Sequence, residues 1–188
     1  IESLEMGSDS AEVFRQEFLA LSKDSEGYLF PETYLFPRDA TANTVVNKMT
    51  QTFDIKISEF QSGIDNSKYT LNQIVTMASI IERETKTDEE RAIVAGILWK
   101  RLEADGWLIQ ADATIQYVIG NANCRSQKAN CEDWWPILTK VDLEIDSPYN
   151  SYKFKPLPPT PIANPGLSSL KAAIYPEDSP YWFYIHDS

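Results

Sequence analysis

The sequence contains a single histidine, two cysteines and seven glycines in 188 residues, and these shortages exclude several kinds of active site. Serine and cysteine nucleophiles usually need a histidine base, and the one histidine, His186, stands near the end of the chain. No G-x-S-x-G segment, glycine-rich phosphate loop or H-E-x-x-H motif is present. Two cysteines and one distant histidine do not make a zinc site. Carboxylate chemistry is therefore the main candidate for catalysis.

Basic residues are few, with 17 lysines and arginines against 28 acidic residues and a formal net charge of −11. The basic residues do not cluster, so nothing in the sequence indicates a surface for nucleic acid. A neutral or amide-rich glycan is compatible with this charge, although acidity that only keeps the protein soluble explains it equally well. No run approaches the roughly 20 apolar residues of a membrane span, and no signal peptide is recognisable. We therefore expect this chain by itself to be soluble and globular.

The two cysteines, Cys124 and Cys131, are separated by the polar stretch RSQKAN. In an oxidising compartment such a pair could close a small loop as a disulfide. In a reducing compartment the same residues would be two free thiols. The sequence leaves both alternatives open.

Three stretches carry apolar residues at helical spacing and predict helices over 9–22, 41–61 and 88–104. Gly106 follows the last of these as a stop signal, since glycine readily adopts the left-handed conformation that ends helices. Residues 26–37 hold two prolines and alternating aromatic side chains, which favour an extended, partly buried segment. In the helix over 88–104, the residues expected to be buried are Ile93, Val94, Ile97, Leu98 and Leu102.

Two capping patterns mark helix starts in the middle of the chain. Thr70 and Gln73 match a capping box and predict a helix that begins at Leu71 and runs through IVTMASIIERET. Thr87 and Glu90 repeat the pattern, which predicts a break before the helix over 88–104.

The second half of the chain is less regular. Residues 112–120 are compatible with a helix or a strand, and 121–148 resembles a polar insertion with a pair of tryptophans. The five prolines of 155–166 exclude a helix or a central strand and favour a rigid loop suited to lining a cleft. Ser168 is expected to cap a short helix, and 181–185 (YWFYI) has the composition of a strand. The expected fold class is α+β, mainly helical with a small β-sheet.

Glu82 and Glu84 are the carboxylate candidates on the helix that begins at Leu71. The residues three, four and seven positions before Glu84 are all apolar, whereas the corresponding neighbours of Glu82 are more mixed. Glu84 is therefore expected to face the apolar side of the helix, where lost hydration would raise its pKa, as a general acid requires. The alternative is that both are solvated carboxylates, one of them paired with Arg83 or Arg91.

Several segments carry more specific motifs. They are EGYLFPETY at 26–34, LNQIVTMASIIERET at 71–85, DEERAIVAGILWKRL at 88–102, LIQADATIQYVIG at 108–120, YNSY at 149–152 and LPPTPIANPGLSSLKAA at 157–173. Together they resemble the endolytic murein transglycosylase family (MltG, YceG-like), in that family's order and spacing. The resemblance implies a lysozyme-like helix that carries the catalytic acid.

In that family the acid is the second glutamate of E-[KR]-E-T, which is Glu84 here and agrees with the argument from the helix face. The resemblance implies an endolytic lytic transglycosylase that cleaves the MurNAc–GlcNAc bond inside peptidoglycan strands. The product would be a 1,6-anhydroMurNAc end, formed without consuming water. One group would suffice: Glu84 would protonate the leaving oxygen and then take a proton from the sugar's own 6-hydroxyl.

Eight further residues match family motifs and are expected to contact the substrate, because their amide, hydroxyl and aromatic groups suit a glycan. They are Gln110, Asp112, Thr114, Tyr117, Tyr149, Asn150, Tyr152 and Asn164. Each has a structural alternative: Asp112 could cap a helix, and Tyr117 could belong to the core. The chain departs from the family at Ala111, where a threonine or serine is usual, and at Ala113, often a proline.

The resemblance further implies a helical lead-in over residues 1–25, a catalytic domain over 26–188, and no metal or cofactor. The expected partners are peptidoglycan strands, with cell-wall synthases as a further candidate and no nucleic acid. We expect the longer protein to work at the extracytoplasmic face of the bacterial cytoplasmic membrane. Its membrane contact would come only from an N-terminal anchor, which the family carries beside a LysM-like subdomain and which this sequence does not show.

Three rival hypotheses remain at this point. A muramidase would use water instead of the 6-hydroxyl, with Asp112 as the second carboxylate that hydrolysis usually needs. A glycan-binding module would have lost catalysis altogether. A scaffold for cell-wall synthesis enzymes would bind proteins and not glycans.

Overall fold

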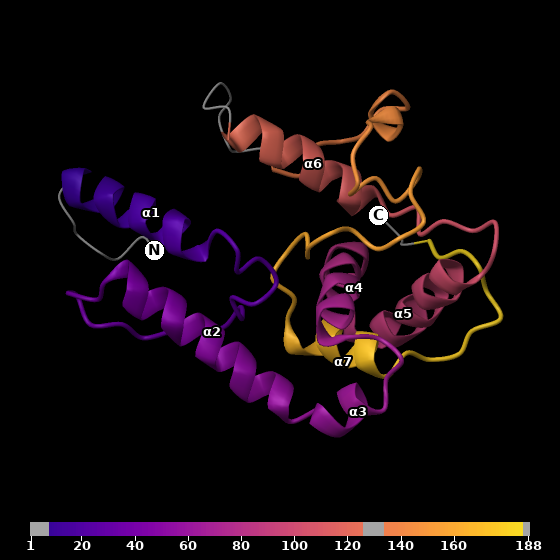
Figure 1. Ribbon diagram of the computed structural model, residues 1–188, viewed down its shortest axis with the longest axis horizontal. Helices are drawn as coiled ribbons and strands as arrows, with labels where there is room; N and C mark the ends of the chain where they lie inside the picture. Colours follow the sequence, from indigo (N-terminus) through magenta and orange to yellow (C-terminus); the bar gives the residue numbers. More distant parts are fainter. Residues whose placement is uncertain (1–7, 126–133, 186–188) are drawn as a thin grey trace.

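The computed structural model describes residues 8–125 and 134–185, and helices joined by irregular loops make up this part of the chain (Figure 1). In chain order they are α1 (Ser8–Ser22), α2 (Ala42–Ser58), α3 (Gln61–Asp65), α4 (Leu71–Glu84), α5 (Asp88–Glu103), α6 (Asp112–Arg125), the 3-10 helix η1 (Asp142–Glu144) and α7 (Leu167–Ile174). The mainly helical prediction is confirmed. The described residues contain no strand, 181–185 included, so the small sheet stays a prediction.

Helix α4 is the centre of the fold, and it packs against α5, α6 and α7 (Figure 1). The predicted capping box is present at its start: Thr70 accepts from the Gln73 backbone, and the Gln73 side chain accepts from the Thr70 backbone. Every residue from Ile74 to Ile81 is buried, so this segment forms core on all its faces. The last turn of α4 leaves this core.

Helix α5 confirms the predicted bounds closely but not the predicted cap. Thr87 makes no capping hydrogen bond, and three acidic residues in the first turn stabilise the helix start instead. Ile93, expected to be buried, is 37% exposed, because the buried face of α5 is centred on Val94, Ile97 and Leu98. Gly106 has the expected left-handed backbone, with a φ of 78°.

In the second half of the chain, the structure settles the one choice between helix and strand that the sequence left open. Residues 112–120 form the first part of helix α6, not a strand. The proline-rich segment 155–166 is non-helical, as predicted. Helix α7 begins at Leu167 with Gly166 at its cap position, two residues earlier than expected. The predicted cap Ser168 is wrong, because its hydroxyl donates to Asp88 on α5.

The N-terminal helices α1 and α2 lie side by side, away from α4 (Figure 1). The helix expected over 41–61 ends at Ser58, and the separate short helix α3 follows it. The segment predicted as extended over 26–37 begins with a turn at 26–28, where the Tyr28 N–H donates to the Ser25 carbonyl. Residues 30–37 form no helix, and Leu29 and Phe30 are buried. Across the described residues, no helix combines the length and apolarity that crossing a bilayer requires.

Candidate active site

A pocket of about 320 Å³ opens where α4 ends, and Glu84 lines it. The other lining residues come from distant stretches of the chain that only the fold brings together. They are Arg101, Gln110, Asp112, Tyr152, Phe183 and Tyr184. Of the predicted contact residues, Gln110, Asp112 and Tyr152 thus share the pocket with Glu84, and their contact with a substrate stays a prediction.

Thr85 determines where α4 ends and so where Glu84 points. Its backbone N–H donates to the Ile81 carbonyl at 3.1 Å, and its hydroxyl donates to the same oxygen at 2.7 Å. Its own backbone is extended, so Glu84 is the last helical residue. A buried threonine after the glutamate therefore has a physical reason: it closes the last turn and turns the chain away.

The Glu84 carboxylate accepts hydrogen bonds from two separate elements. The Tyr184 hydroxyl donates to Oε2 at 2.9 Å, and the backbone N–H of Ala113 lies 3.4 Å from Oε1. Ala113 is in the first turn of α6, where unpaired N–H groups and the helix dipole favour a negative charge. Both contacts therefore stabilise the ionised form of Glu84.

Arg101, in the last turn of α5, is a buried cation beside this carboxylate. Its guanidinium donates to the Ile109 carbonyl at 2.8 Å and, through Nε, to the Trp182 carbonyl at 2.7 Å. Burial lowers the pKa of Arg101, and the nearby acidic groups of Tyr184, Tyr152 and Glu84 counteract part of that effect. Its positive charge favours the ionised form of Glu84.

Gln110 lies in the pocket wall with a φ of 56°, in the left-handed region that side chains rarely adopt. Two contacts from the 149–152 turn hold it there. The Gln110 N–H donates to the Ser151 carbonyl at 3.0 Å, and the Ala111 N–H donates to the Ser151 hydroxyl at 3.0 Å. Backbone strain of this kind is commonly found at functional sites.

Asp112 and Tyr152 form a pair on the pocket wall, with the tyrosine hydroxyl donating to the carboxylate. Burial raises the pKa of Tyr152, and the bond to Asp112 raises it further. The Tyr152 hydroxyl thus keeps its proton and acts as a hydrogen-bond donor. Asp112 is the second carboxylate of the pocket and the first residue of α6.

Two of the predicted contact residues are buried inside the protein. The Thr114 hydroxyl donates to the Ala111 carbonyl at 2.7 Å and lies 2.9 Å from the Ser151 hydroxyl. Asn150 donates to the carbonyls of Leu143 and Ile145, and its side-chain oxygen accepts from the Tyr152 N–H. In the structure these residues hold the pocket wall together, and direct contact with a substrate stays a prediction for both.

The remaining predicted contact residues lie outside the Glu84 pocket. Tyr117 and Tyr149 pack ring to ring, with centroids 5.2 Å apart, and line a second hollow of about 280 Å³ beside α6. The Asn164 side-chain oxygen accepts from the N–H groups of Gly27 and Leu29 at 2.8 and 3.1 Å. Asn164 therefore joins the proline-rich loop to the turn at 26–29.

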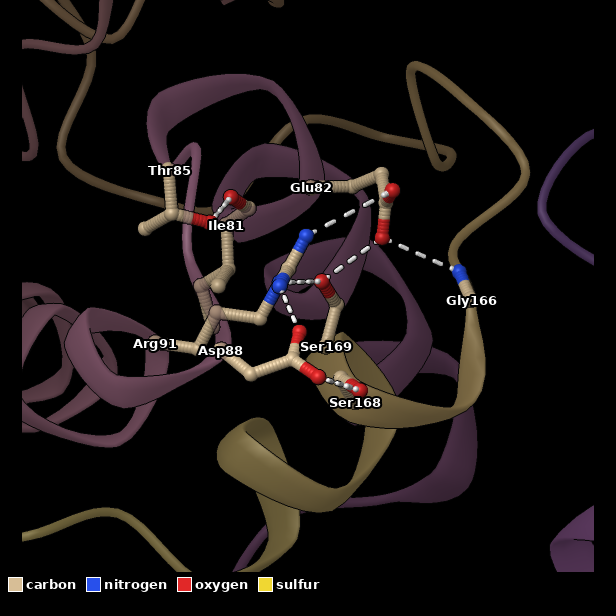
Figure 2. Close-up of polar contacts among 8 residues, drawn as sticks. All are labelled: Ile81, Glu82, Thr85, Asp88, Arg91, Gly166, Ser168 and Ser169. Atoms are coloured by element: carbon tan, nitrogen blue, oxygen red, sulfur yellow. Dashed lines mark hydrogen bonds and ion pairs between the residues drawn. The ribbon is translucent and has the colours of Figure 1, made fainter.

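Glu82 has quite different surroundings, which Figure 2 shows. Its Oε2 accepts from the Gly166 N–H at 3.0 Å and from the Ser169 hydroxyl at 2.7 Å, both at the start of α7. Arg91 on α5 lies 3.9 Å from the other oxygen and donates to Ser169 at 3.0 Å. Arg91 also pairs with Asp88. Glu82 thus joins α4, α5 and α7 and does not line the Glu84 pocket.

The two glutamates do not differ in the way that the apolar spacing predicts. Both are half-buried, and the turns before them are core on every face. The wall around Glu84 is polar and aromatic, with a buried cation, and is not an apolar surface. Hydrogen-bond partners separate the two residues, and the raised pKa expected for Glu84 stays a prediction.

Comparison with known proteins agrees with this arrangement. The model of the YceG-like family matches residues 2–188. The chain belongs to the YceG-like family. It is 35% identical over 164 residues to an endolytic murein transglycosylase of Bacillus subtilis (strain 168), and 32% identical over 162 residues to one of Streptococcus pneumoniae (serotype 2, strain D39). These alignments cover 87% and 86% of this chain.

The YceG-like chain spans less than half the length of these curated relatives, with 42% of the first and 28% of the second covered. A crystal structure of a YceG-like protein from Listeria monocytogenes superposes with a TM-score of 0.75 and 32% sequence identity. That superposition covers 94% of this chain and 62% of the other. The helical arrangement is therefore shared with a solved member of the family.

Sequence reasoning about this YceG-like chain missed three residues of the pocket, which are Arg101, Phe183 and Tyr184. Arg101 had a signal: it falls three and four positions after the buried Leu98 and Ile97, so a charge lies on the apolar face of α5. No sequence signal indicated Tyr184, because nothing in a run of aromatic residues shows which one contacts Glu84. Cys131 and His186 lie outside the described residues, so the proposed disulfide stays a prediction.

Proposed function

We propose that this chain is the catalytic domain of an endolytic peptidoglycan transglycosylase, with Glu84 as its acid and base. The observation that carries the proposal is the position of Glu84: it ends α4 at a pocket where Tyr184 and the start of α6 can stabilise its carboxylate. Relatives that align with most of this chain are named endolytic murein transglycosylases, which supports the same reaction class.

The reaction divides into two proton transfers at one group. Protonated Glu84 gives its proton to the glycosidic oxygen between MurNAc and GlcNAc, and the bond to the anomeric carbon breaks. The carboxylate that remains takes the proton of the MurNAc 6-hydroxyl, whose oxygen attacks the anomeric carbon and closes the 1,6-anhydro ring. Because the nucleophile belongs to the same sugar, proximity supplies much of the rate.

The surroundings of Glu84 suit both stages of this sequence. The Ala113 N–H and the Tyr184 hydroxyl stabilise the carboxylate formed in the first stage, as does the charge of Arg101. Gln110, Asp112 and Tyr152 supply polar groups on the same wall for sugar hydroxyls and acetamido groups. We propose that these side chains hold the sugar rings on either side of the bond.

A muramidase is the second candidate, and Asp112 is the observation that favours it. This carboxylate lines the same pocket as Glu84, so the site contains the two acidic groups that hydrolysis usually needs. Asp112 already accepts from the Tyr152 hydroxyl, which occupies part of its capacity to activate water. The transglycosylase remains the better supported of the two.

Digestion of purified peptidoglycan, followed by mass spectrometry of the soluble products, tests the proposal. The transglycosylase predicts anhydro-ended fragments, lighter by one water than the reducing ends that a muramidase releases. A digest carried out in H₂¹⁸O sharpens this difference, because only a hydrolase puts solvent oxygen on the new end. Binding to the cell wall without any soluble fragment would contradict both enzyme proposals.

We further propose that peptidoglycan strands are the partner of the longer protein at the extracytoplasmic face of the cytoplasmic membrane. The substrate itself is the reason, because peptidoglycan is found on that side. Cell-wall synthases are a further candidate partner, and a pull-down with purified synthases tests this point.

A further inference from the structure

The segment after α7 returns along α5 toward the pocket. The Glu177 N–H donates to the Ala92 carbonyl at 2.9 Å. Gly96 permits this approach, since a Cβ at that position would lie 1.9 Å from the Glu177 carbonyl oxygen. Lys100 then donates to the Ser179 carbonyl at 2.6 Å and also to the Tyr181 carbonyl. Main-chain contacts thus fix the path of this segment turn by turn along α5.

Arg101 holds the end of the segment in place. It donates to the Trp182 carbonyl through Nε and to the Ile109 carbonyl through Nη1, so one buried cation joins two segments of the pocket wall. The Trp182 ring stacks on Trp107, with centroids 4.3 Å apart. Arg101 therefore determines where the next residues of the segment can reach.

The anchored segment places Tyr184 in contact with Glu84, the proposed acid. Its hydroxyl donates to Glu84 Oε2 at 2.9 Å across a separation of a hundred residues. Burial raises the pKa of Tyr184 well above its usual range, and the charge of Glu84 raises it further. The hydroxyl therefore stays protonated and remains a donor over the whole working pH range.

We propose that Tyr184 is a positioning residue of the reaction, which orients the Glu84 carboxyl group and stabilises the carboxylate left after proton donation. This inference deepens the proposed function and rests on it. The Tyr184 proton stays on its own oxygen throughout, while Glu84 alone gives and receives the proton that moves. No motif used to assign the family includes Tyr184, so it adds a residue from the segment 181–185 to the site.

The contacts explain why this bond matters more for chemistry than for folding. Trp182 and Arg101 already anchor the segment through the main chain and ring stacking. Removal of one hydroxyl leaves these contacts intact. Glu84, by contrast, would lose the 2.9 Å bond from Tyr184, which is shorter than its 3.4 Å contact from Ala113.

Tyr184→Phe tests the inference, with Tyr181→Phe as the matched control from the same segment. Tyr181 is 67% exposed, and its backbone carbonyl makes the contact to Lys100, so the control leaves the anchor unchanged. Two quantities are measured for each variant on soluble, uncrosslinked glycan strands: kcat and KM. The third measurement is the titration of Glu84, followed by the ¹³C shift of its carboxyl carbon, which needs no activity.

We expect Tyr184→Phe to lower kcat by roughly 10- to 100-fold, the worth of one hydrogen bond to a charged group, with little change in KM. The midpoint of the Glu84 titration should be about one pH unit higher in this variant, because a donor to the ionised form is lost. Tyr181→Phe should match the parent in all three. An unchanged Glu84 titration in Tyr184→Phe overturns the inference, whatever the rate does.

The titration also separates this inference from the proposed function. If the parent chain releases no anhydro product, the proposed function fails, yet the Glu84 titration still decides whether Tyr184 controls that carboxyl group. If the parent is active and Tyr184→Phe retains its kcat and its Glu84 titration, only the inference fails.

Discussion

Glu82 and Glu84 are two residues apart on one helix, and their surroundings differ. Two residues turn an α-helix by about 200°, so their side chains leave α4 on opposite sides. Glu82 is surrounded by partners on α5 and α7 (Figure 2), whereas Glu84 lines a pocket and accepts from Tyr184 and from the start of α6. A carboxylate saturated with structural partners stabilises the fold, and one left at a pocket can react.

The largest expected effect comes from shortening Glu84 by one methylene. Glu84→Asp draws the carboxylate away from Tyr184 and from the bond to be cleaved, and a misplacement of about 1 Å can cost about 100-fold in rate. We expect the release of anhydro ends to fall by that factor, with the free energy of unfolding unchanged. Initial rates and urea unfolding measure the two quantities, and a rate within twofold of the parent would contradict the account.

The next prediction replaces the other glutamate, Glu82, and concerns the stability of the fold. Glu82→Ala leaves Ser169, the Gly166 N–H and Arg91 without their acceptor, and hydrogen bonds to charged groups are worth about 2 kcal/mol. We expect the free energy of unfolding to fall by that amount while the rate per folded molecule stays close to the parental value. Urea unfolding monitored by circular dichroism checks it; unchanged stability would show that the Glu82 contacts contribute little.

The pH dependence of stability reports on the pocket and not on the Glu82 cluster, because Tyr184 and Tyr152 line the pocket and have a raised pKa. Tyr69, which lies outside both, adds to the effect, since burial and its bond to Glu103 raise its pKa. Burial raises the pKa of Tyr184 and Tyr152 above the ordinary value of about 10. Above that pH the unfolded chain loses these protons while the folded chain keeps them, so the free energy of unfolding should fall as pH rises. Unfolding at pH 8 to 11 measures the slope.

Tyr184→Phe should make this alkaline fall shallower, since one of the groups that causes it is gone. Tyr181→Phe is the control, because it removes an exposed tyrosine from the same segment. Equal slopes for all three proteins would be inconsistent with the burial of Tyr184 in the folded chain.

The smallest expected effect concerns strain. Among the described residues, Gln110 is the only residue other than glycine with a positive φ, and it lies in the pocket and not in the Glu82 cluster. Gln110→Gly should relieve the strain and stabilise the fold by about 0.5 kcal/mol, while the loss of the amide slows turnover several-fold. Differential scanning calorimetry and initial rates check both; a lower melting temperature would argue against strain at this position.

Local signals predicted much of the fold. The capping box at Thr70 fixed the start of α4, and Gly106 marked the end of the segment after α5, because both depend on neighbours in sequence. Thr87 stands at the predicted cap position but makes no capping hydrogen bond, whereas the predicted cap at Ser168 was wrong because α7 begins at Leu167. Ser168 meets Asp88 from another helix, and no sequence pattern encodes that meeting.

Glu84, the proposed acid, lines the pocket, but the argument from the helix face does not explain why Glu84 does so and Glu82 does not. The core turns of α4 are apolar on every side, so helical spacing cannot separate Glu84 from Glu82. Similarity to family motifs selected Glu84, and the partners of the two residues explain the choice afterwards. Tyr184 and Arg101 depend on contacts across the whole fold, which a single sequence does not reveal.

The most direct test compares Glu84→Gln with Glu82→Gln in the same digest of uncrosslinked glycan strands, with the folded fraction of each measured beforehand. An amide keeps the size of the side chain but cannot give or take the proton. We predict that Glu84→Gln releases anhydro ends at least about 100-fold more slowly at parental stability, and that Glu82→Gln works at a near-parental rate per folded molecule. Parental turnover by Glu84→Gln would show that the proton comes from another group.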